Sequence, residues 1–365
     1  MIDPEKRSEL LRPRMMKDGK FLITRIGGSV QEADQNKILD NYFRYKNYIS
    51  GDNEFEEEWM TASLKDVWST KFLGLVDNLW SRPLKEIKKL EYQNPQYAAA
   101  FRFDGRKGDP RDYNKVFAAQ VSGCTYACNF CYVPPEINAA AQGFGKFFSA
   151  SEIVDNFLSV KKESKEPMNV IRLTGGETTI IPEIILDVFA EIEKRGLKIY
   201  LWIDTNLSTS TYLERIEGDL RDVFKKNAGV VGCFKGVSKE DFFMITGSKP
   251  QFYENQFETA KLLLSWKADT YIYLPGLIYG KNYEKKAESF IQRLRDINKN
   301  LPLRLEMLII KEYPGAVINI EQKKKEGRPL PETDQKAVFN LWYNKLLPRI
   351  YSEKMLRKFG CEVPL

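Results

Sequence analysis

Three cysteines within eight residues are the part of the sequence best suited to chemistry. Cys124, Cys128 and Cys131 lie in the run VSGCTYACNFCYVPP with the spacing C-x3-C-x2-C. Three thiolates on one short loop can bind three irons of a 4Fe-4S cubane and leave the fourth iron without a protein ligand. A metal with an open coordination position can do chemistry, whereas a closed site only supports a fold. The spacing therefore predicts a catalytic cluster.

The rest of the composition limits what could close this site. The chain has no histidine and five cysteines, so a fourth cysteine ligand would be Cys233 or Cys361, and each stands alone. An odd count with three cysteines clustered is not typical of a disulfide framework. The alternative is a structural zinc or electron-transfer cluster completed by a remote residue. Without histidine, acid-base chemistry would fall to Lys, Glu, Asp, Tyr or Cys.

Length, charge and hydropathy set the outer limits. A chain of 365 residues can bury a large core, and its net charge of +6 permits nucleic-acid binding without indicating it. No apolar run approaches the roughly 18 to 20 residues that cross a bilayer. The opening MIDPEKRSELLRPR has no signal-peptide core. We expect a cytoplasmic protein without a membrane partner.

Six short apolar runs alternate with helical patterns between Val116 and Ile310. Near-continuous apolar runs that end in Gly, Asn or Pro are typical of parallel strands buried on both faces. Six βα units are too few for a closed eight-stranded barrel, so we predict an α/β fold with a partial (β/α)6 TIM-like barrel. The predicted strands are Val116–Gly123, Asn169–Glu177, Lys198–Asn206, Val230–Gly236, Asp269–Gly276 and Leu303–Ile310.

Helix signals stand between these runs. Ser149 and Glu152 form a capping box for the first helix, and Pro182 suits the first turn of the second. The last helix carries one apolar stripe that would cover the sheet, made of Ala287, Phe290, Ile291, Leu294 and Ile297.

Polar residues follow the predicted strands where each strand ends. Barrel enzymes build their sites at the carboxyl-terminal ends of the strands, so one face should collect these residues. In chain order they are Cys124, then Gly175, Gly176 and Glu177, then Asp204, Thr205 and Asn206, then Lys235, and finally Lys311. Asp204 and Asn206 would either contact a ligand or cap the next helix.

The chain divides into three parts. Residues 1–114 form an N-terminal region without recognisable chemistry, with helical patterns over 64–79 and 83–92. Residues 115–312 form the barrel core. Residues 313–365 contain the charged run NIEQKKKEGRPLPETD, which is typical of a loop, and a helical pattern from about Asp334 to Lys358.

The cysteine loop, the Gly-Gly-Glu turn and the strand order together resemble the radical S-adenosylmethionine (SAM) superfamily, over about half of the chain. The resemblance implies that Cys124, Cys128 and Cys131 ligate one 4Fe-4S cluster and that Phe130 packs near the adenine of SAM. It also implies reductive cleavage of SAM to a 5′-deoxyadenosyl radical that abstracts hydrogen from a substrate, under anaerobic conditions. The electron would come from a donor such as flavodoxin or ferredoxin.

The same resemblance implies roles for the polar strand ends. Gly175, Gly176 and Glu177 would hold the methionyl amino end of SAM, because glycines permit close approach and a carboxylate can accept bonds from an ammonium. Lys235 would pair with the SAM carboxylate. Asp204, Asn206 and Lys311 fall where related enzymes contact SAM.

Two subfamilies share features with this chain. The stretch Asp204 to Asn206 and the run YIYLPG resemble glycyl radical enzyme activases, and Phe234 to Gly247 resembles archaeal wyosine-type enzymes that modify tRNA. The chain departs from the activases at Thr178, Cys233 and Lys311, where they have Pro, Asp and His. The substrate therefore stays open among protein, RNA and small molecule. A non-catalytic zinc or Fe-S binding module is the hypothesis from another class.

Overall fold

The computed structural model describes residues 1–26, 102–105, 116–131, 133–164, 168–277, 279, 281–308, 325, 338, 341–356 and 362–365. The helical patterns predicted over 64–79 and 83–92 lie outside these residues, as do Lys311 and Cys361. No helix in the described ranges combines the length and apolar character that a bilayer crossing requires.

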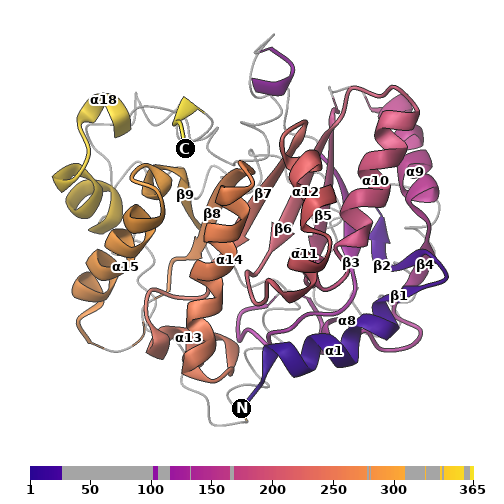
Figure 1. The fold of residues 1–365 in the computed structure, drawn as a ribbon. Helices are drawn as coiled ribbons and strands as arrows, with labels where there is room; N and C mark the ends of the chain where they lie inside the picture. Colours follow the sequence, from indigo (N-terminus) through magenta and orange to yellow (C-terminus); the bar gives the residue numbers. More distant parts are fainter. Residues whose placement is uncertain are drawn as a thin grey trace, which may run out of the picture.

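Six parallel strands form the centre of the molecule (Figure 1). They run in chain order along the sheet, and their register joins each strand to the next. All six predicted strands are confirmed, and so is the partial barrel, because β9 has no described partner on its outer side. The strands are β3 (Phe117–Val121), β5 (Val170–Gly175), β6 (Tyr200–Thr205), β7 (Ala228–Cys233), β8 (Asp269–Pro275) and β9 (Leu305–Leu308).

The first 26 residues extend this sheet at its other edge. Helix α1 (Pro4–Met15) leads into β1 (Met16–Lys17) and β2 (Lys20–Ile26), which form a hairpin. Its turn suits Asp18 and Gly19, because both adopt positive φ, 51° and 67°. Strand β2 pairs antiparallel with β3 and with β4 (Lys146–Phe148). The N-terminal segment thus shares the barrel's sheet, and the domain division at residue 114 stays a prediction.

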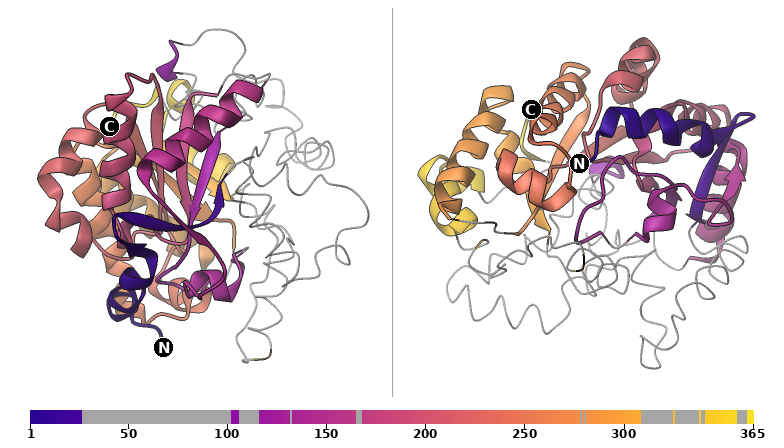
Figure 2. Two further views of the ribbon diagram at one scale, coloured as in Figure 1. Left: turned by 90° about the vertical axis from the view of Figure 1, so that its right-hand side faces the viewer. Right: turned by 90° about the horizontal axis from the view of Figure 1, so that it is seen from below.

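Helices cover one face of the sheet (Figures 1 and 2). The predicted capping box is confirmed: the Ser149 hydroxyl accepts from the Glu152 backbone at 3.2 Å, and the Glu152 carboxylate accepts from the Ser149 backbone at 2.7 Å. Pro182 stands one position earlier than predicted, at the N-cap of α10. The helices are α9 (Ala150–Glu163), α10 (Glu183–Lys194), α11 (Thr211–Arg215), α12 (Glu217–Phe224), α13 (Lys239–Thr246), α14 (Tyr253–Ser265) and α15 (Tyr283–Ile297).

The apolar stripe on α15 packs as predicted. Ala287, Phe290, Ile291 and Leu294 are buried in the main core, and Ile297 packs against it. The Phe290 ring meets Phe234 edge to face at 5.2 Å between centroids, so the helix is fixed to the segment that follows β7.

The predicted C-terminal helix is interrupted. Residues Leu341–Leu346 form a π-helix, Leu347–Arg349 a 3-10 turn and Glu353–Leu356 the short helix α18. Pro348 explains the break, because proline lacks the backbone N–H that a continuous α-helix needs. The described part of this segment is therefore a series of short turns.

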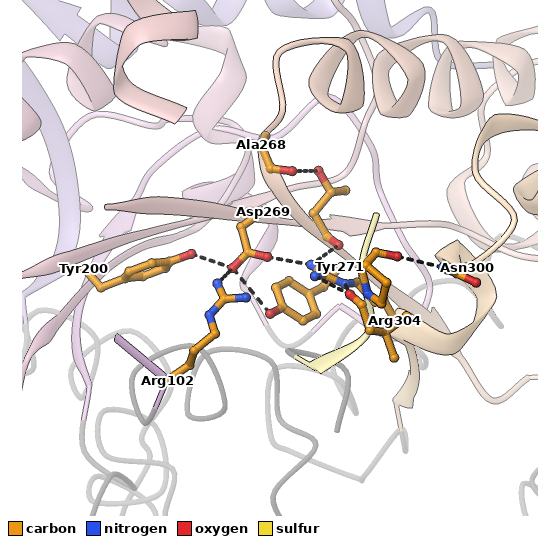
Figure 3. Close-up of polar contacts among 10 residues, drawn as sticks. Arg102, Tyr200, Ala268, Asp269, Tyr271, Asn300 and Arg304 are labelled. Atoms are coloured by element: carbon orange, nitrogen blue, oxygen red, sulfur yellow. Dashed lines mark hydrogen bonds and ion pairs between the residues drawn. The ribbon is translucent and has the colours of Figure 1, made fainter. Parts of the chain in front are cut away.

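The amino-terminal end of the barrel contains a charged network around Asp269, the first residue of β8 (Figure 3). Arg102 and Arg304 both pair with its carboxylate, and the Tyr200 hydroxyl donates to it at 2.8 Å. Burial alone would raise the pKa of Asp269, but the two arginines outweigh burial and lower the pKa below its ordinary value. Arg304 also donates to the carbonyl of Val363 at 2.7 Å, which holds the C-terminal segment against the barrel.

Candidate active site

The cysteine loop follows β3 directly and is held by backbone hydrogen bonds. Gly123 donates to the carbonyl of Ile137 at 2.8 Å, and Cys124 donates to that of Asn138 at 2.9 Å. Both acceptors belong to the short helix α8 (Pro135–Asn138), so the chain returns on itself around the three thiols. The loop conformation is thus set before any ligand is bound.

Two asparagines donate to the cysteine sulfurs. The side-chain amide of Asn206, after β6, lies 3.4 Å from Sγ of Cys124. The amide of Asn138 lies 3.4 Å from Sγ of Cys131. Hydrogen bonds to cluster sulfurs tune and orient metal ligands, so both side chains stand where a cluster would need them.

The three thiols are close enough to influence one another. Burial raises the pKa of Cys124 to about 11 and also raises the pKa of Cys128 and Cys131, and the neighbouring thiols contribute. A thiol with a raised pKa keeps its proton at neutral pH, so iron would have to displace these protons to bind.

The chemistry of the donor set suits an iron-sulfur cluster. Three cysteine thiols lie on one loop, and asparagine amides lie within hydrogen-bonding distance of two of their sulfurs. Thiolates are the ligands that bind such clusters, and hydrogen bonds to the sulfurs orient them. The residues present therefore fit the cluster that the spacing predicts.

The glycine turn after β5 packs directly on the start of the cysteine loop. Gly176 donates to Val121 at 2.9 Å, and Glu177 donates to Gly123 at 2.7 Å. A Cβ on Gly176 would stand 1.8 Å from the Gly123 carbonyl oxygen, and Gly175 has φ +103°. Both positions require glycine. Here the close approach is to the cysteine loop, which the sequence analysis did not anticipate.

Glu177 is fully buried and already accepts hydrogen bonds from the protein. Its carboxylate accepts hydrogen bonds from the backbone N–H and the hydroxyl of Thr179, at 3.0 and 2.6 Å. It also accepts from the Thr205 hydroxyl at 2.7 Å and from the backbone N–H of Asn206 at 2.6 Å. Burial nevertheless raises the pKa of Glu177. The side chain thus joins the end of β5 to the end of β6. Its predicted contact with the amino end of SAM stays a prediction.

Asp204 pairs with Arg172 of the neighbouring strand inside the barrel. The Arg172 guanidinium donates to the carboxylate at 3.0 and 2.6 Å, and Thr174 and Trp202 donate at 2.6 and 3.0 Å. The alternative that Asp204 caps a helix is wrong, because α11 begins only at Thr211. Its role as a cofactor contact stays a prediction.

Asn206 positions the cysteine loop rather than a helix. Its amide donates to the Thr125 hydroxyl at 2.9 Å as well as to Cys124, and its carbonyl accepts from the Ser208 backbone at 3.0 Å. The capping alternative is wrong here too. Thr125 in turn donates to the Ser208 hydroxyl at 2.8 Å, so β6 and the cysteine loop form one network.

Lys235 lies beside the thiols, two residues after the end of β7. Burial lowers the pKa of Lys235, and its electrostatic interactions with Cys233 and the three loop cysteines raise it by more. Cys233, the last residue of β7, is a free thiol whose pKa burial raises to about 12. Phe130 is partly buried against the main core. The structure thus brings Lys235 to the cysteine loop.

The barrel interior contains a charged residue that the sequence analysis missed. Glu306 in the middle of β9 interacts electrostatically with Arg172 on β5, and Tyr273 on β8 interacts with both. Strand β5 is not a neighbour of β8 or β9 in the sheet, so the interaction of Arg172 with the other two side chains places all three on the interior face of the barrel. The signal was present in LRLEMLII, where Arg304 and Glu306 interrupt an apolar run, and in NVIRLTGGE, where Arg172 stands between Ile171 and Leu173.

The chain is similar in sequence to known proteins. Residues 121–277 match the model of the Radical SAM superfamily. A pyruvate formate-lyase-activating enzyme of Clostridium pasteurianum is 22% identical over 216 residues, which cover 59% of this chain and 85% of that protein.

Solved structures also match the chain. A spore photoproduct lyase mutant matches with 12% identity and a TM-score of 0.45 over 63% of this chain and 72% of its own. Native anSMEcpe with bound AdoMet matches with 15% identity and a TM-score of 0.38 over 62% of this chain and 60% of its own.

The matched residues contain the features described above. They run from the end of β3 to just beyond β8 and include the cysteine loop, the glycine turn and Lys235. The chain therefore contains a radical SAM domain over residues 121–277, and it is an enzyme.

Proposed function

We propose that this enzyme binds one 4Fe-4S cluster and SAM at the carboxyl-terminal end of its barrel and uses them to remove a hydrogen atom from a substrate. The observation that carries the proposal is the direct packing of the glycine turn on the cysteine loop, with Lys235 beside the thiols. When bound, the cluster supplies the electron that splits SAM into methionine and a 5′-deoxyadenosyl radical.

The chain's own residues would orient both groups. Cys124, Cys128 and Cys131 would hold three irons, and the amides of Asn206 and Asn138 would donate to two of the sulfurs. The backbone of the glycine turn would face the methionyl part of SAM, since Gly175 and Gly176 carry no side chain to obstruct it. Phe130 would pack near the adenine.

Lys235 would bind the SAM carboxylate. The groups that act on its ammonium are cysteine thiols, and a carboxylate at this position would complete a charge-assisted hydrogen bond. A buried ammonium with an anionic partner is far less costly than one without. Asp204 is paired with Arg172, so we propose that it acts indirectly, by fixing the end of β6 beside the SAM site. Lys311 would reach SAM from the segment after β9.

The similarity to an enzyme that activates pyruvate formate-lyase supports a protein as the substrate. It covers 85% of that relative. We therefore propose an activase-like reaction in which a segment of a partner protein enters the barrel, with a flavodoxin or ferredoxin as the electron donor.

The test is anaerobic reconstitution of the full chain with iron and sulfide, followed by SAM and dithionite. We expect about four irons and four sulfides per chain and formation of 5′-deoxyadenosine and methionine. Lys235→Ala should raise the SAM concentration at half-saturation by roughly tenfold or more, as loss of a charge-assisted bond does.

The matched control is Lys225→Ala, an exposed lysine on the outer surface, which should leave half-saturation unchanged. Stoichiometric zinc without sulfide, or a cluster-loaded protein that never cleaves SAM, would refute the proposal.

A further inference from the structure

The interior of the barrel contains a carboxyl oxygen that the fold leaves unused. Oε2 of Glu306 is shielded from solvent and has no hydrogen-bond partner in the described part of the chain. Leu305 and Met307 on either side of it are buried in the hydrophobic core, so alternation along β9 turns Glu306 to the opposite face. A buried polar atom without a partner costs about 1 to 3 kcal/mol, and such atoms are rare.

The residues around Glu306 come from strands β5 to β8 and from the C-terminal π-helix. Arg172 and Asp204 form an ion pair, so their charges cancel. Tyr273 is opposite Glu306 in the register of β8 and β9, and Cys233 is opposite Tyr273 in that of β7 and β8. Tyr343, from the C-terminal π-helix, also interacts with the Glu306 carboxyl.

Tyr273 and Cys233 lie between Glu306 and the cysteine loop. Cys233 interacts electrostatically with Cys128 and with Lys235. Glu306 thus lies on the interior face of the barrel that also carries Cys233, the residue linked to Lys235 and to the cysteine loop. A substrate that enters the barrel toward the proposed SAM site would meet Glu306 on this face.

We propose that Glu306 is a substrate-binding residue that donates a hydrogen bond, as a neutral carboxylic acid, to an amide carbonyl of the substrate. This inference rests on the proposed function, since it concerns the same barrel. It names what the interior recognises: a neutral amide, such as a peptide group.

The charges near Glu306 favour a neutral amide over a cation as the substrate group that Glu306 binds. A substrate ammonium would have to pass the ammonium of Lys235, and the ion pair of Arg172 and Asp204 would offer it no net negative charge. Burial raises the pKa of Glu306 to about 8, although Arg172 opposes the shift, so at pH 7 the group carries a proton that it can donate. A carbonyl oxygen accepts that proton without bringing a new charge into the interior.

The test uses the cluster-loaded enzyme with SAM, dithionite and N-acetylglycinamide deuterated at its α-carbon. Deuterium in 5′-deoxyadenosine reports that the probe lies beside the radical, and the half-saturating probe concentration reports its binding. Thermal stabilisation of the protein by the probe gives a second readout that does not depend on turnover.

Three variants distinguish the roles. Glu306→Gln keeps a donor, so half-saturation should stay within about threefold of the wild-type value and lose its pH dependence. Glu306→Ala should raise half-saturation by roughly tenfold. Glu258→Gln, which removes an exposed carboxylate from an ion pair with Lys261, should change nothing. In the wild type, half-saturation should rise as the pH passes through about 8, because ionised Glu306 can no longer donate.

Other outcomes overturn the inference. They are an unchanged half-saturation in Glu306→Ala, or stronger thermal stabilisation by propylamine or propionate than by the amide. Formation of 5′-deoxyadenosine without any probe is measured in the same samples. If it is absent in the wild type, the proposed function fails; if it is present while the probe results fail, only the role of Glu306 is lost.

Discussion

The two ends of the barrel treat buried charge in opposite ways. At the amino-terminal end, Asp269 is surrounded by two arginines and a tyrosine that fill its bonding capacity (Figure 3). Farther along the interior, Glu306 keeps one oxygen without a described partner, and Lys235 faces thiols. Satisfied buried networks stabilise a fold, whereas unsatisfied groups call for a ligand. We therefore expect the amino-terminal end to serve stability, and we propose that the carboxyl-terminal end serves chemistry.

The largest effect should come from the cysteine loop. Cys128→Ala should remove the cluster, so the iron and sulfide content and the cleavage of SAM should fall to background while the secondary structure stays. Metal analysis and 5′-deoxyadenosine formation measure this.

Cys233→Ala is the matched control, because it removes a neighbouring thiol and should keep about four irons per chain. A fourth ligand at Cys233 would show itself as cluster loss in that variant, and the assignment of an open iron would then be wrong.

The next effect should come from the glycine turn. Gly176→Ala places a Cβ against the Gly123 carbonyl, so the cysteine loop must shift and cluster binding should be lost or strongly weakened. Gly218→Ala in α12 is the control, since open space surrounds that position, and it should stabilise the protein by about 0.5 to 1 kcal/mol. Equal cluster content in the two variants would contradict the tight packing of the turn.

Removing Asp269 should cost stability rather than chemistry. Asp269→Ala leaves Arg304 buried without its partner, which should lower the free energy of unfolding by about 3 to 5 kcal/mol. Because the pKa of Asp269 is lowered in the fold, its contribution is present above the ordinary value of 3.8 and is lost as the pH falls below it.

Denaturant unfolding at pH 7 and at pH 3.5 measures both points. Half-saturation for SAM in the surviving folded protein should be unchanged. A higher SAM concentration at half-saturation in folded Asp269→Ala would show that the amino-terminal end also affects chemistry, and the division of roles between the two ends would be wrong.

The smallest effect should be on the pH dependence of stability that Glu306 gives to the substrate-free protein. Its pKa in the fold is about 8 against an ordinary 4.5, so the folded state favours the protonated form and stability falls as the pH rises from about 4.5 to 8. Glu306→Gln cannot ionise, so relative to wild type it should gain on the order of 1 to 3 kcal/mol between pH 5 and pH 8.5. Thermal unfolding at both pH values measures it, and a constant difference would contradict the burial of an unsatisfied acid.

The strands and the position of the cysteine loop directly after β3 could be predicted because their signals are local. Strands buried on both faces require continuous apolar residues, and a polar run directly after such residues marks the end of the strand. The capping box of Ser149 and Glu152 is local in the same sense and was confirmed.

Contacts between distant segments could not be predicted in this way. The sequence shows that Gly176 follows a strand, but not that the Gly123 carbonyl fills the space beside it. Asp204 was assigned to a ligand or a cap because its partner Arg172 belongs to another strand. The interruption of the C-terminal helix had a visible signal in Pro348, which the apolar pattern around it outweighed.

The antiparallel edge has a consequence for synthesis. Ile23 of β2 pairs with Val121 of β3, and residues 27–116 lie between them in the chain. On a ribosome that adds ~5 to 20 residues per second, β2 would wait for several seconds with its hydrogen-bonding groups unpaired before its partner strand emerges. During that interval the nascent hairpin would be open to mispairing with other chains, so a holdase chaperone should raise the yield of native enzyme.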